Sequence, residues 1–321
     1  MKVIVIGGAG YIGAHIVDSL CEEGHDVLVF DNLNSGFKEN LNEKCKFING
    51  DILDSSFLDK VFEQEEFDAL IHMAALKSAN KSMDNTQLYT TTNLMGSINV
   101  ISAAIKFNID KIIFSSTAAV YGNPMTDVID EKHPINPVSY YGLSKLYVEQ
   151  YLALMERVYG IKYIALRYFN AAGYSEKLNL IKYKEVNPQN LLPIIMEVAN
   201  GSRSKLQIFG NDYNTKDGTC IRDYIHVIDL ADAHIKALEY LNKGSSCSIN
   251  LSSNRGYSVL EVVNYATEII GREIKFKFSQ RRPGDPTSLI SSNNLARKKL
   301  KWTPRNSTIQ KIITTMWEHY K

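Results

Sequence analysis

The amino-terminal half of the chain alternates short apolar runs with longer stretches of helical periodicity. It opens with an apolar run at residues 3–6, a helical stretch at 11–23 and a second apolar run at 27–30. Further apolar runs occupy 45–48, 69–72, 111–115 and 163–166, with helical patterns at 56–65, 94–107 and 140–159 between them. The runs are apolar on both faces, as expected for parallel strands covered by helices on each side. The pattern predicts an α/β fold built on a doubly wound parallel sheet.

The pattern loosens after Asn170. The segment 171–190 contains Gly173, Pro188 and several Asn and Lys residues, which is typical of a loop or a boundary. Beyond it we predict helices at 192–199, 227–240 and 259–270 and short strands at 206–209 and 247–251. The second half therefore reads as a smaller α/β lobe. We expect one domain at 1–170 and another at 171–321, with segments near 223–240 returning to the first.

Composition excludes several classes of protein. The 321 residues contain 36 Lys plus Arg and 35 Asp plus Glu, a net charge of +1, which gives no overall field for nucleic acid or an anionic membrane. The four cysteines form no CxxC pair, and the seven histidines follow no ligand spacing, so we expect neither disulfides nor a metal site. No apolar stretch reaches the roughly 18 residues of a membrane helix. A cytoplasmic protein without membrane or nucleic-acid partners is expected.

A glycine-rich turn follows the first predicted strand and opens the first predicted helix. Gly7, Gly10 and Gly13 are spaced three apart, with Tyr11 and Ile12 at the start of the helix. The first glycine permits the sharp turn, the second lets the backbone approach a pyrophosphate, and the third allows the helix to pack closely on the strand. Free N–H groups at the helix start then hold the phosphates. This context predicts a dinucleotide site of the Rossmann type.

An aspartate ends the second predicted strand, eighteen residues after Gly13. Asp31 is placed to accept hydrogen bonds from the adenosine ribose hydroxyls. A 2′-phosphate would be repelled by this carboxylate, and no Arg follows among the next three residues, so NAD is expected rather than NADP. A turn or helix-cap role for Asp31 is the alternative. Asp51, which ends the third predicted strand, gives a weaker indication of a contact with adenine.

A tyrosine and a lysine lie one helical turn apart at the head of the 140–159 stretch. Tyr141 and Lys145 therefore share one face of that helix. A free tyrosine has a pKa of ~10, so it acts as a base near neutrality only when a neighbouring cation stabilises the phenolate. Ser115 and Thr117 stand at the end of a predicted strand, where an open α/β sheet binds its ligand. The three residues Tyr141, Lys145 and Thr117 are the candidates for proton transfer.

Together these motifs resemble the extended short-chain dehydrogenase/reductases, and within them the UDP-glucose 4-epimerase family. The resemblance continues through Arg167-Tyr168-Phe169-Asn170, Phe209-Gly210-Asn211-Asp212-Tyr213, Arg222-Asp223-Tyr224-Ile225-His226 and Arg281-Arg282-Pro283-Gly284-Asp285. It covers nearly the whole chain. It implies a redox-neutral inversion at C4 of a UDP-hexose through a 4-keto sugar, on tightly held NAD, in a homodimer formed through the helices at 94–107 and 140–159.

The resemblance also implies which residues contact each ligand. The cofactor residues would be Gly7, Gly10, Tyr11, Ile12, Gly13, Asp31, Asn32, Asn34, Ser35, Gly36, Asp51, Ile52, Met73, Ala74, Ala75, Lys77, Thr92, Ser115, Tyr141, Lys145, Tyr168 and Phe169. The UDP-sugar residues would be Thr117, Tyr141, Asn170, Asn190, Leu191, Gln207, Phe209, Arg222, Arg282, Asp285 and Leu289. The loop at 173–187 lacks the acidic, glycine-rich sequence usual in the family, so its role stays open.

Alternatives remain at this level. Another NAD-dependent nucleotide-sugar enzyme, such as a UDP-pentose or UDP-uronate epimerase or a dehydratase, shares the scaffold, although Thr117 is followed by Ala118-Ala119-Val120 without the acid that dehydration needs. The second alternative is a catalytically silent NAD sensor.

Leu289 bears on which sugars are accepted. It occupies a position where members restricted to glucose and galactose carry a tyrosine, so we expect room for N-acetylated sugars; an ordinary core leucine is the competing interpretation.

Overall fold

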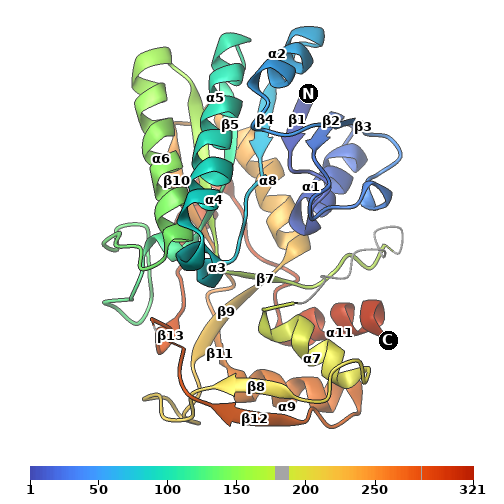
Figure 1. Cartoon of the computed structure of the whole chain (residues 1–321), viewed down its shortest axis with the longest axis vertical. Coiled ribbons are helices and arrows are strands. Elements are labelled where there is room, and N and C mark those ends of the chain that lie inside the picture. Colours follow the sequence, from blue (N-terminus) through green and yellow to red (C-terminus); the bar gives the residue numbers. More distant parts are fainter. Residues whose placement is uncertain (178–187, 283) are drawn as a thin grey trace.

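The computed structural model describes residues 1–177, 188–282 and 284–321. Its larger element is a seven-stranded sheet in which every pair of neighbours is parallel, in the order β10-β6-β5-β4-β1-β2-β3 (Figure 1). The strands are β1 (Lys2–Ile6), β2 (Asp26–Asp31), β3 (Lys46–Asn49), β4 (Ala69–His72), β5 (Lys111–Thr117), β6 (Lys162–Tyr168) and β10 (Cys247–Leu251). The predicted doubly wound parallel sheet is confirmed.

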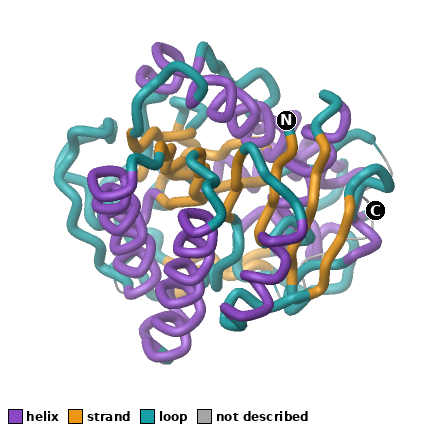
Figure 2. The backbone as a smooth tube through the Cα atoms, turned by 90° about the horizontal axis from the view of Figure 1, so that it is seen from above, coloured by secondary structure: helices purple, strands orange, loops and turns teal. Residues whose placement is uncertain are grey.

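Helices cover both faces of this sheet, as the view from above shows (Figure 2). One face carries α2 (Ser55–Gln64), α5 (Gly96–Lys106) and α6 (Tyr140–Tyr159), and the other carries α1 (Tyr11–Glu22), α8 (Val227–Leu241) and α10 (Asn294–Leu300). Along β1, Val3 and Val5 pack on one face while Ile4 and Ile6 pack on the other. Both faces are buried, which explains why the strand reads as a continuous apolar run.

A short helical region links β4 to α5. It consists of α3 (Ala79–Asp84), α4 (Thr86–Tyr89) and a π-helical segment at Thr90–Met95 that continues directly into α5. The predicted helix at 94–107 is thus α5 together with the end of the π-helical segment. Two single 3₁₀ turns, Lys38–Asn40 and Ala118–Val120, follow β2 and β5. None of the helices in the described parts of the chain has the length and hydropathy of a membrane span.

The second lobe lies below the large sheet in Figure 1 and has two small sheets. In one, β9 (Ile221–His226) is paired with β7 (Asn170–Ala172), β11 (Gly256–Ser258) and β13 (Ser288–Leu289); in the other, β8 (Leu206–Phe209) is parallel to β12 (Phe276–Ser279). The helices α7 (Leu191–Ala199), α9 (Val259–Ile270) and α11 (Ile309–Tyr320) pack together around a separate apolar core. The predicted strand at 206–209 and helix at 259–270 have these same bounds.

The chain crosses between the two lobes more than once. After β9, helix α8 packs against α1, and β10 forms hydrogen bonds with β6 at the edge of the large sheet. Sequence analysis placed the strand at 247–251 in the second lobe, because periodicity carries no information about pairing partners. The proposed division of the chain at residue 170 stays a prediction. Most of the predicted loop at 173–187, namely 178–187, lies outside the described residues.

Candidate active site

Two of the three glycines in the turn after β1 are required by the fold. Gly7 has a φ of +83°, and a Cβ there would lie 2.5 Å from the backbone nitrogen of Ala74. A Cβ on Gly13 would lie 2.4 Å from the carbonyl oxygen of Gly7. These glycines let α1 and the chain after β4 approach the end of β1 closely.

The middle glycine has no such structural reason. A Cβ on Gly10 would meet only the carbonyl oxygen of Gly7, at an ordinary 3.5 Å, and the φ of −72° suits any residue. Gly10 is also the N-cap of α1, and its helix start receives no side-chain cap. A bare helix start with space above it fits a pyrophosphate, whose charge the helix dipole stabilises. Gly10, Tyr11 and Ile12 would hold the phosphates of a dinucleotide.

The carboxylate of Asp31 faces the glycine-rich turn from the end of β2. It accepts hydrogen bonds from the N–H of Ala9 at 3.0 Å and the N–H of Leu33 at 2.8 Å, and burial raises its pKa. Each carboxylate oxygen keeps a lone pair for a ribose hydroxyl. Asn32 donates to Asp51 across 3.0 Å, which brings the ends of β2 and β3 together. Gly36 packs against Ala9, so the segment 32–36, including Asn34 and Ser35, borders the same turn.

The chain after β4 is held by an asparagine that sequence analysis missed. Asn93 accepts from the N–H of Leu76 at 2.8 Å and donates to its carbonyl at 3.0 Å. The neighbouring Thr92, rather than Asn93, was predicted to contact the cofactor. Met73 and Ala74 both donate to the carbonyl of Ile6, so residues 73–77 run beside β1. Ile52 is buried against Gly96 at the start of α5.

The three candidates for proton transfer meet at the end of β5. Tyr141 forms a hydrogen bond through its side chain with Thr117, and its backbone N–H donates to Ser82 at 2.9 Å. One turn along α6, the ammonium of Lys145 donates to the carbonyl of Ser115 at 2.7 Å and lies 4.7 Å from the centre of the Phe114 ring. The α6 helix and the β5 end together therefore hold a hydroxyl, a phenol and an ammonium in one place.

Burial opposes charge on both members of the tyrosine–lysine pair. It raises the pKa of Tyr141 to about 12, against the lowering effect of the Thr117 hydrogen bond. It lowers the pKa of Lys145 to about 7, and the carboxylate of Glu149 opposes this shift. A phenolate forms here only when positive charge lies close to it, which is what a charged Lys145 and a cationic ligand ring supply.

One cavity of about 420 Å³ extends from these residues into the second lobe. The predicted site residues that line it are Tyr11, Ile12, Lys77, Thr117, Tyr141, Tyr168, Phe169, Asn170, Asn190, Leu191, Gln207, Phe209, Arg222, Arg282 and Asp285. Leu289 is not part of the lining. It is paired with Arg222 in the β9–β13 ladder and packs against a small apolar cluster that includes Phe169. Of the remaining predicted residues, Thr92 lies in the π-helical segment and Lys145 on α6, and the others lie along the glycine-rich turn and near the strand ends described above.

The far end of the cavity carries two arginines. Arg222 on β9 forms an ion pair with Asp285 at 2.5 Å. The guanidinium of Arg282 stacks on the ring of Phe209 at 3.9 Å. Guanidinium groups pair with phosphate oxygens through two parallel hydrogen bonds, so this end suits a diphosphate.

Sequence analysis missed several residues of the lining. They are Ser116, Tyr174, Gln189, Tyr224 and Val259, which come from β5, the segment after β7, the residue before the N-cap of α7, β9 and the start of α9. Most read as ordinary strand or helix residues, and only their position in the folded chain brings them to the cavity. Ser116 stood inside the Ser115–Thr117 motif and could have been found there.

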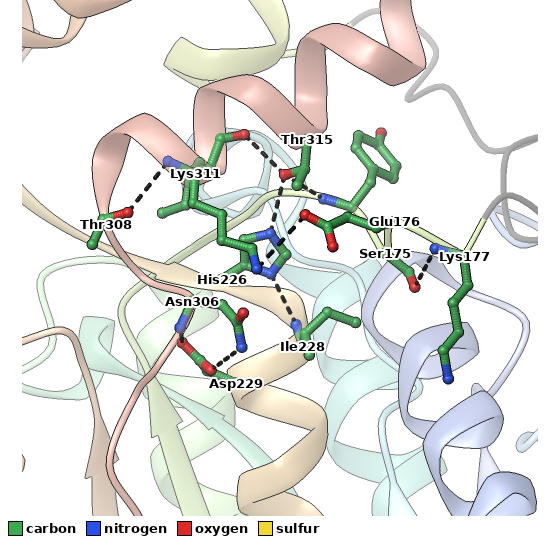
Figure 3. A network of polar contacts seen from close by, with 12 residues as sticks. Ser175, Glu176, Lys177, His226, Ile228, Asp229, Asn306, Thr308, Lys311 and Thr315 are labelled. Carbon is green, nitrogen blue, oxygen red and sulfur yellow. Dashed lines mark hydrogen bonds and ion pairs between the residues drawn. The ribbon is translucent and has the colours of Figure 1, made fainter.

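A polar network anchors the wall of the cavity that Tyr174 forms (Figure 3). The imidazole of His226 contacts the hydroxyl of Thr315 on α11 at 3.0 Å, and the same hydroxyl accepts from the N–H of Tyr174 at 3.3 Å. Lys311 forms an ion pair with Glu176 at 3.6 Å. Strand β9, helix α11 and residues 174–176 are therefore tied together.

Comparison with known proteins agrees with this geometry. Residues 3–251 match the model of the NAD dependent epimerase/dehydratase family. A curated relative named UDP-glucose 4-epimerase, from Lacticaseibacillus casei, is 44% identical over 100% of this chain and 97% of its own. The crystal structure of UDP-glucose 4-epimerase from Brucella ovis in complex with NAD has a TM-score of 0.95 at 37% identity, covering 99% of this chain and 98% of that one.

A second solved structure shows a further ligand. UDP-glucose 4-epimerase from Bifidobacterium longum, in complex with NAD⁺ and UDP, has a TM-score of 0.94 at 34% identity, with 99% of this chain and 98% of that chain covered. The family match spans most of the chain, and the curated relative spans all of it. The chain belongs to the NAD dependent epimerase/dehydratase family and, within it, to the UDP-glucose 4-epimerases.

Proposed function

We propose that the protein interconverts UDP-glucose and UDP-galactose by inverting C4 of the hexose, with NAD as a resident cofactor. The observation that carries this proposal is one cavity that joins two groups of residues. The Tyr141–Thr117 pair lies at one end, and Arg222, Arg282 and Asp285 line the other. A base at one end and a diphosphate clamp at the other match a nucleotide sugar whose reacting hydroxyl reaches the end of β5.

The residues divide the chemistry between them. Bound NAD supplies the reversible uptake of a hydride from C4. Tyr141 takes the proton of the 4-hydroxyl as general base while hydride leaves C4, and it returns that proton to the same oxygen when hydride comes back to the other face of C4. Thr117, hydrogen-bonded to Tyr141, orients the phenol and the reacting hydroxyl, and Lys145 stabilises the phenolate through its charge.

Inversion also requires that the sugar turn while the nucleotide stays bound. Arg222 and Arg282 hold the diphosphate through charge-assisted hydrogen bonds, which are stronger than neutral ones. Asn170, whose amide is held by the carbonyl of Asp223 at 2.8 Å, borders the passage between the two ends. A firm grip on UDP with few bonds to the hexose allows both faces of the 4-keto sugar to be presented to the cofactor.

The test uses purified protein without added cofactor. Incubation with UDP-galactose is expected to give UDP-glucose, and denaturation is expected to release NAD rather than NADP. Absence of UDP-glucose with NAD bound would instead favour the silent NAD sensor. A 4-keto-6-deoxy product would favour the dehydratase, although Ala118 and Ala119 after Thr117 provide no proton donor for loss of water. UDP-pentoses and UDP-uronates, assayed in parallel, test the remaining alternatives.

We extend the proposal to N-acetylated UDP-hexoses. Leu289 does not itself line the cavity, but it packs against the apolar cluster that includes the lining residue Phe169, and its side chain has neither the ring nor the hydroxyl of a tyrosine. Compared with members that carry a tyrosine at this position, a leucine leaves more volume near the end of the cavity that would hold the sugar, and it leaves no polar group without a partner. A 2-acetamido group would find space there.

We also propose a homodimer in the cytoplasm. Large apolar side chains are exposed on α4, α6 and the segment between α4 and α5, namely Leu88, Met95, Leu154, Val158 and Tyr159. If these side chains form one contiguous surface, they would mark an interaction site. Sedimentation of the protein and of Val158→Asp tests the dimer, because a buried unpaired charge at the interface should give monomers.

All four cysteines lie among the described residues and are free thiols, which suits a reducing compartment such as the cytoplasm.

A further inference from the structure

Helix α6 carries a buried carboxylate that the mechanism above does not use. Glu149 is one helical turn beyond Lys145 and is only 5% exposed. It forms an ion pair with Arg167 on β6, at 2.6 Å from Nη2 to Oε2, and receives a second hydrogen bond from Nε at 3.0 Å. The pair is bidentate, and its arginine is equally buried.

The same carboxylate reaches the strand that ends in the active site. The hydroxyl of Ser116 donates a hydrogen bond to Glu149. Ser116 lies between Ser115, whose carbonyl holds Lys145, and Thr117, whose side chain contacts Tyr141. Glu149 therefore fixes the last residues of β5 relative to the helix that carries the base and its cation.

We propose, on the basis of the function proposed above, that Glu149 is a positioning residue for the reaction. Its carboxylate holds the Ser115–Thr117 end of β5 against α6, and its negative charge favours the ammonium form of Lys145. Neither role requires contact with the substrate or the cofactor.

The charged surroundings are consistent with the second role. Lys145 faces Glu149 on its own helix and His72 on β4, and it is Glu149 that raises the lysine pKa against the effect of burial. Glu149 in turn faces Arg167 on β6, Ser116 on β5, Ser248 on β10 and, less closely, Tyr163. The His72 imidazole is neutral because burial lowers its pKa to about 3. Glu149 is thus the anion among the groups that act on Lys145.

Two variants separate charge from position. Glu149→Gln keeps the size of the side chain and an oxygen for Ser116 but removes the charge. We expect the alkaline limb of its rate–pH profile to move down by about one pH unit or more, because the Glu149 charge raises the Lys145 pKa and a nearby opposite charge shifts a pKa by ~1–3. The pKa of Tyr141 should rise in the same variant, because a less charged Lys145 stabilises the phenolate less. Ultraviolet titration measures this pKa, with the phenolate signal taken as the difference from a protein that also carries Tyr141→Phe.

Glu149→Asp keeps the charge and shortens the reach to Ser116. We expect its kcat to fall by roughly tenfold or more, since small displacements at a reacting centre are costly, with an unchanged alkaline limb and an unchanged KM for UDP-galactose. Glu149→Gln leaves Arg167 without a charged partner and could therefore fail to fold. Glu149→Asp keeps that partner, so in that case its kcat alone tests whether Glu149 is a positioning residue.

Ser248→Ala is the matched control. It removes a 3.2 Å hydrogen bond to the same carboxylate from β10 but leaves its charge and its contact with β5. The control is expected to keep the wild-type kcat and pH profile. Wild-type activity is measured first, so an inactive wild type refutes the proposed function alone. An active wild type whose folded Glu149 variants keep its kcat and pH profile overturns the role of Glu149.

Discussion

At the scale of single residues, the active site places ionisable groups where burial opposes their charge. The pKa of Tyr141 is raised to about 12 and that of Lys145 is lowered to about 7, so unliganded protein near neutrality holds the phenol protonated. Positive charge from Lys145 and from a bound cofactor ring would oppose this preference. We therefore expect the proposed base Tyr141 to ionise only with the cofactor bound.

The role of Tyr141 is tested by removing its hydroxyl. Tyr141→Phe should lower kcat by ~10²–10⁴, the usual contribution of a general base, while the fold and NAD content stay unchanged. Turnover of UDP-galactose and nucleotide released on denaturation are the measurements. Tyr140→Phe is the matched control, because the adjacent tyrosine bonds Thr90 rather than Thr117. Near-normal turnover of Tyr141→Phe would remove this residue from the mechanism.

Leu289 bears on the choice of sugar. Leu289→Tyr should abolish turnover of UDP-N-acetylglucosamine and leave that of UDP-galactose within a few-fold of wild type, because a tyrosine ring beside Phe169 would fill the space for the acetamido group. Rates on both sugars are compared in wild type, Leu289→Tyr and the control Leu289→Ile. Wild-type protein that ignores UDP-N-acetylglucosamine would contradict the idea of a wide pocket.

At the scale of elements, local patterns predicted strands and helices well but not their partners. Strand β8 and helix α9 have the bounds read from apolar periodicity, since periodicity reports which side is buried. The pairing of β10 with β6 could not be predicted, because it depends on a crossover of some eighty residues. The same limit hid Tyr224 and Val259, which a strand and a helix in the second lobe bring to the cavity.

The glycine-rich turn illustrates what sequence alone leaves ambiguous. Three glycines were assigned three roles from spacing, and the geometry separates two that the fold needs from one that it does not. Gly7 and Gly13 would clash with backbone atoms if given a Cβ. Packing does not require a glycine at position 10, and the open surroundings of Gly10 leave room for the proposed ligand.

This difference gives a prediction for the turn. Gly10→Ala should lower the free energy of unfolding by no more than about 1 kcal/mol, the cost of alanine at an N-cap, because the added methyl group meets no close neighbour. It should weaken NAD binding roughly tenfold or more, because the methyl group displaces the pyrophosphate from the start of α1. Urea unfolding and NAD content measure the two effects. Gly13→Ala, the comparison variant, should be less stable; equal NAD content in Gly10→Ala and wild type would refute the assignment.

At the scale of the whole molecule, buried histidines connect the two lobes and the large sheet. His15 on α1 accepts from the N–H of Ser175 at 3.1 Å, and His226 contacts Thr315 on α11. His234 on α8 contacts the hydroxyl of Tyr168 at 2.6 Å, and His72 contacts Ser97 at 2.7 Å. Each imidazole therefore makes a hydrogen bond between elements that are distant in sequence, and each is shielded from water.

These histidines predict how stability depends on pH. Burial lowers the pKa of His15 and His234 to about 4 and of His72 and His226 to about 3, from 6.5. Near pH 5 the unfolded chain therefore binds about four protons on these histidines that the folded protein does not, so stability falls as the pH falls. Asp223, with its pKa raised to about 7 by burial, opposes this by one proton. At ~1.4 kcal/mol per proton and pH unit, the net loss of unfolding free energy approaches about 4 kcal/mol from pH 6 to 5.

Urea unfolding at pH 7, 6 and 5 with NAD in excess measures this loss. His72→Gln should reduce the dependence of the unfolding free energy on pH by the contribution of one proton. Equal unfolding free energies at pH 6 and 5 would show that the folded protein takes up these protons too, and that the histidine contacts do not survive in solution as described.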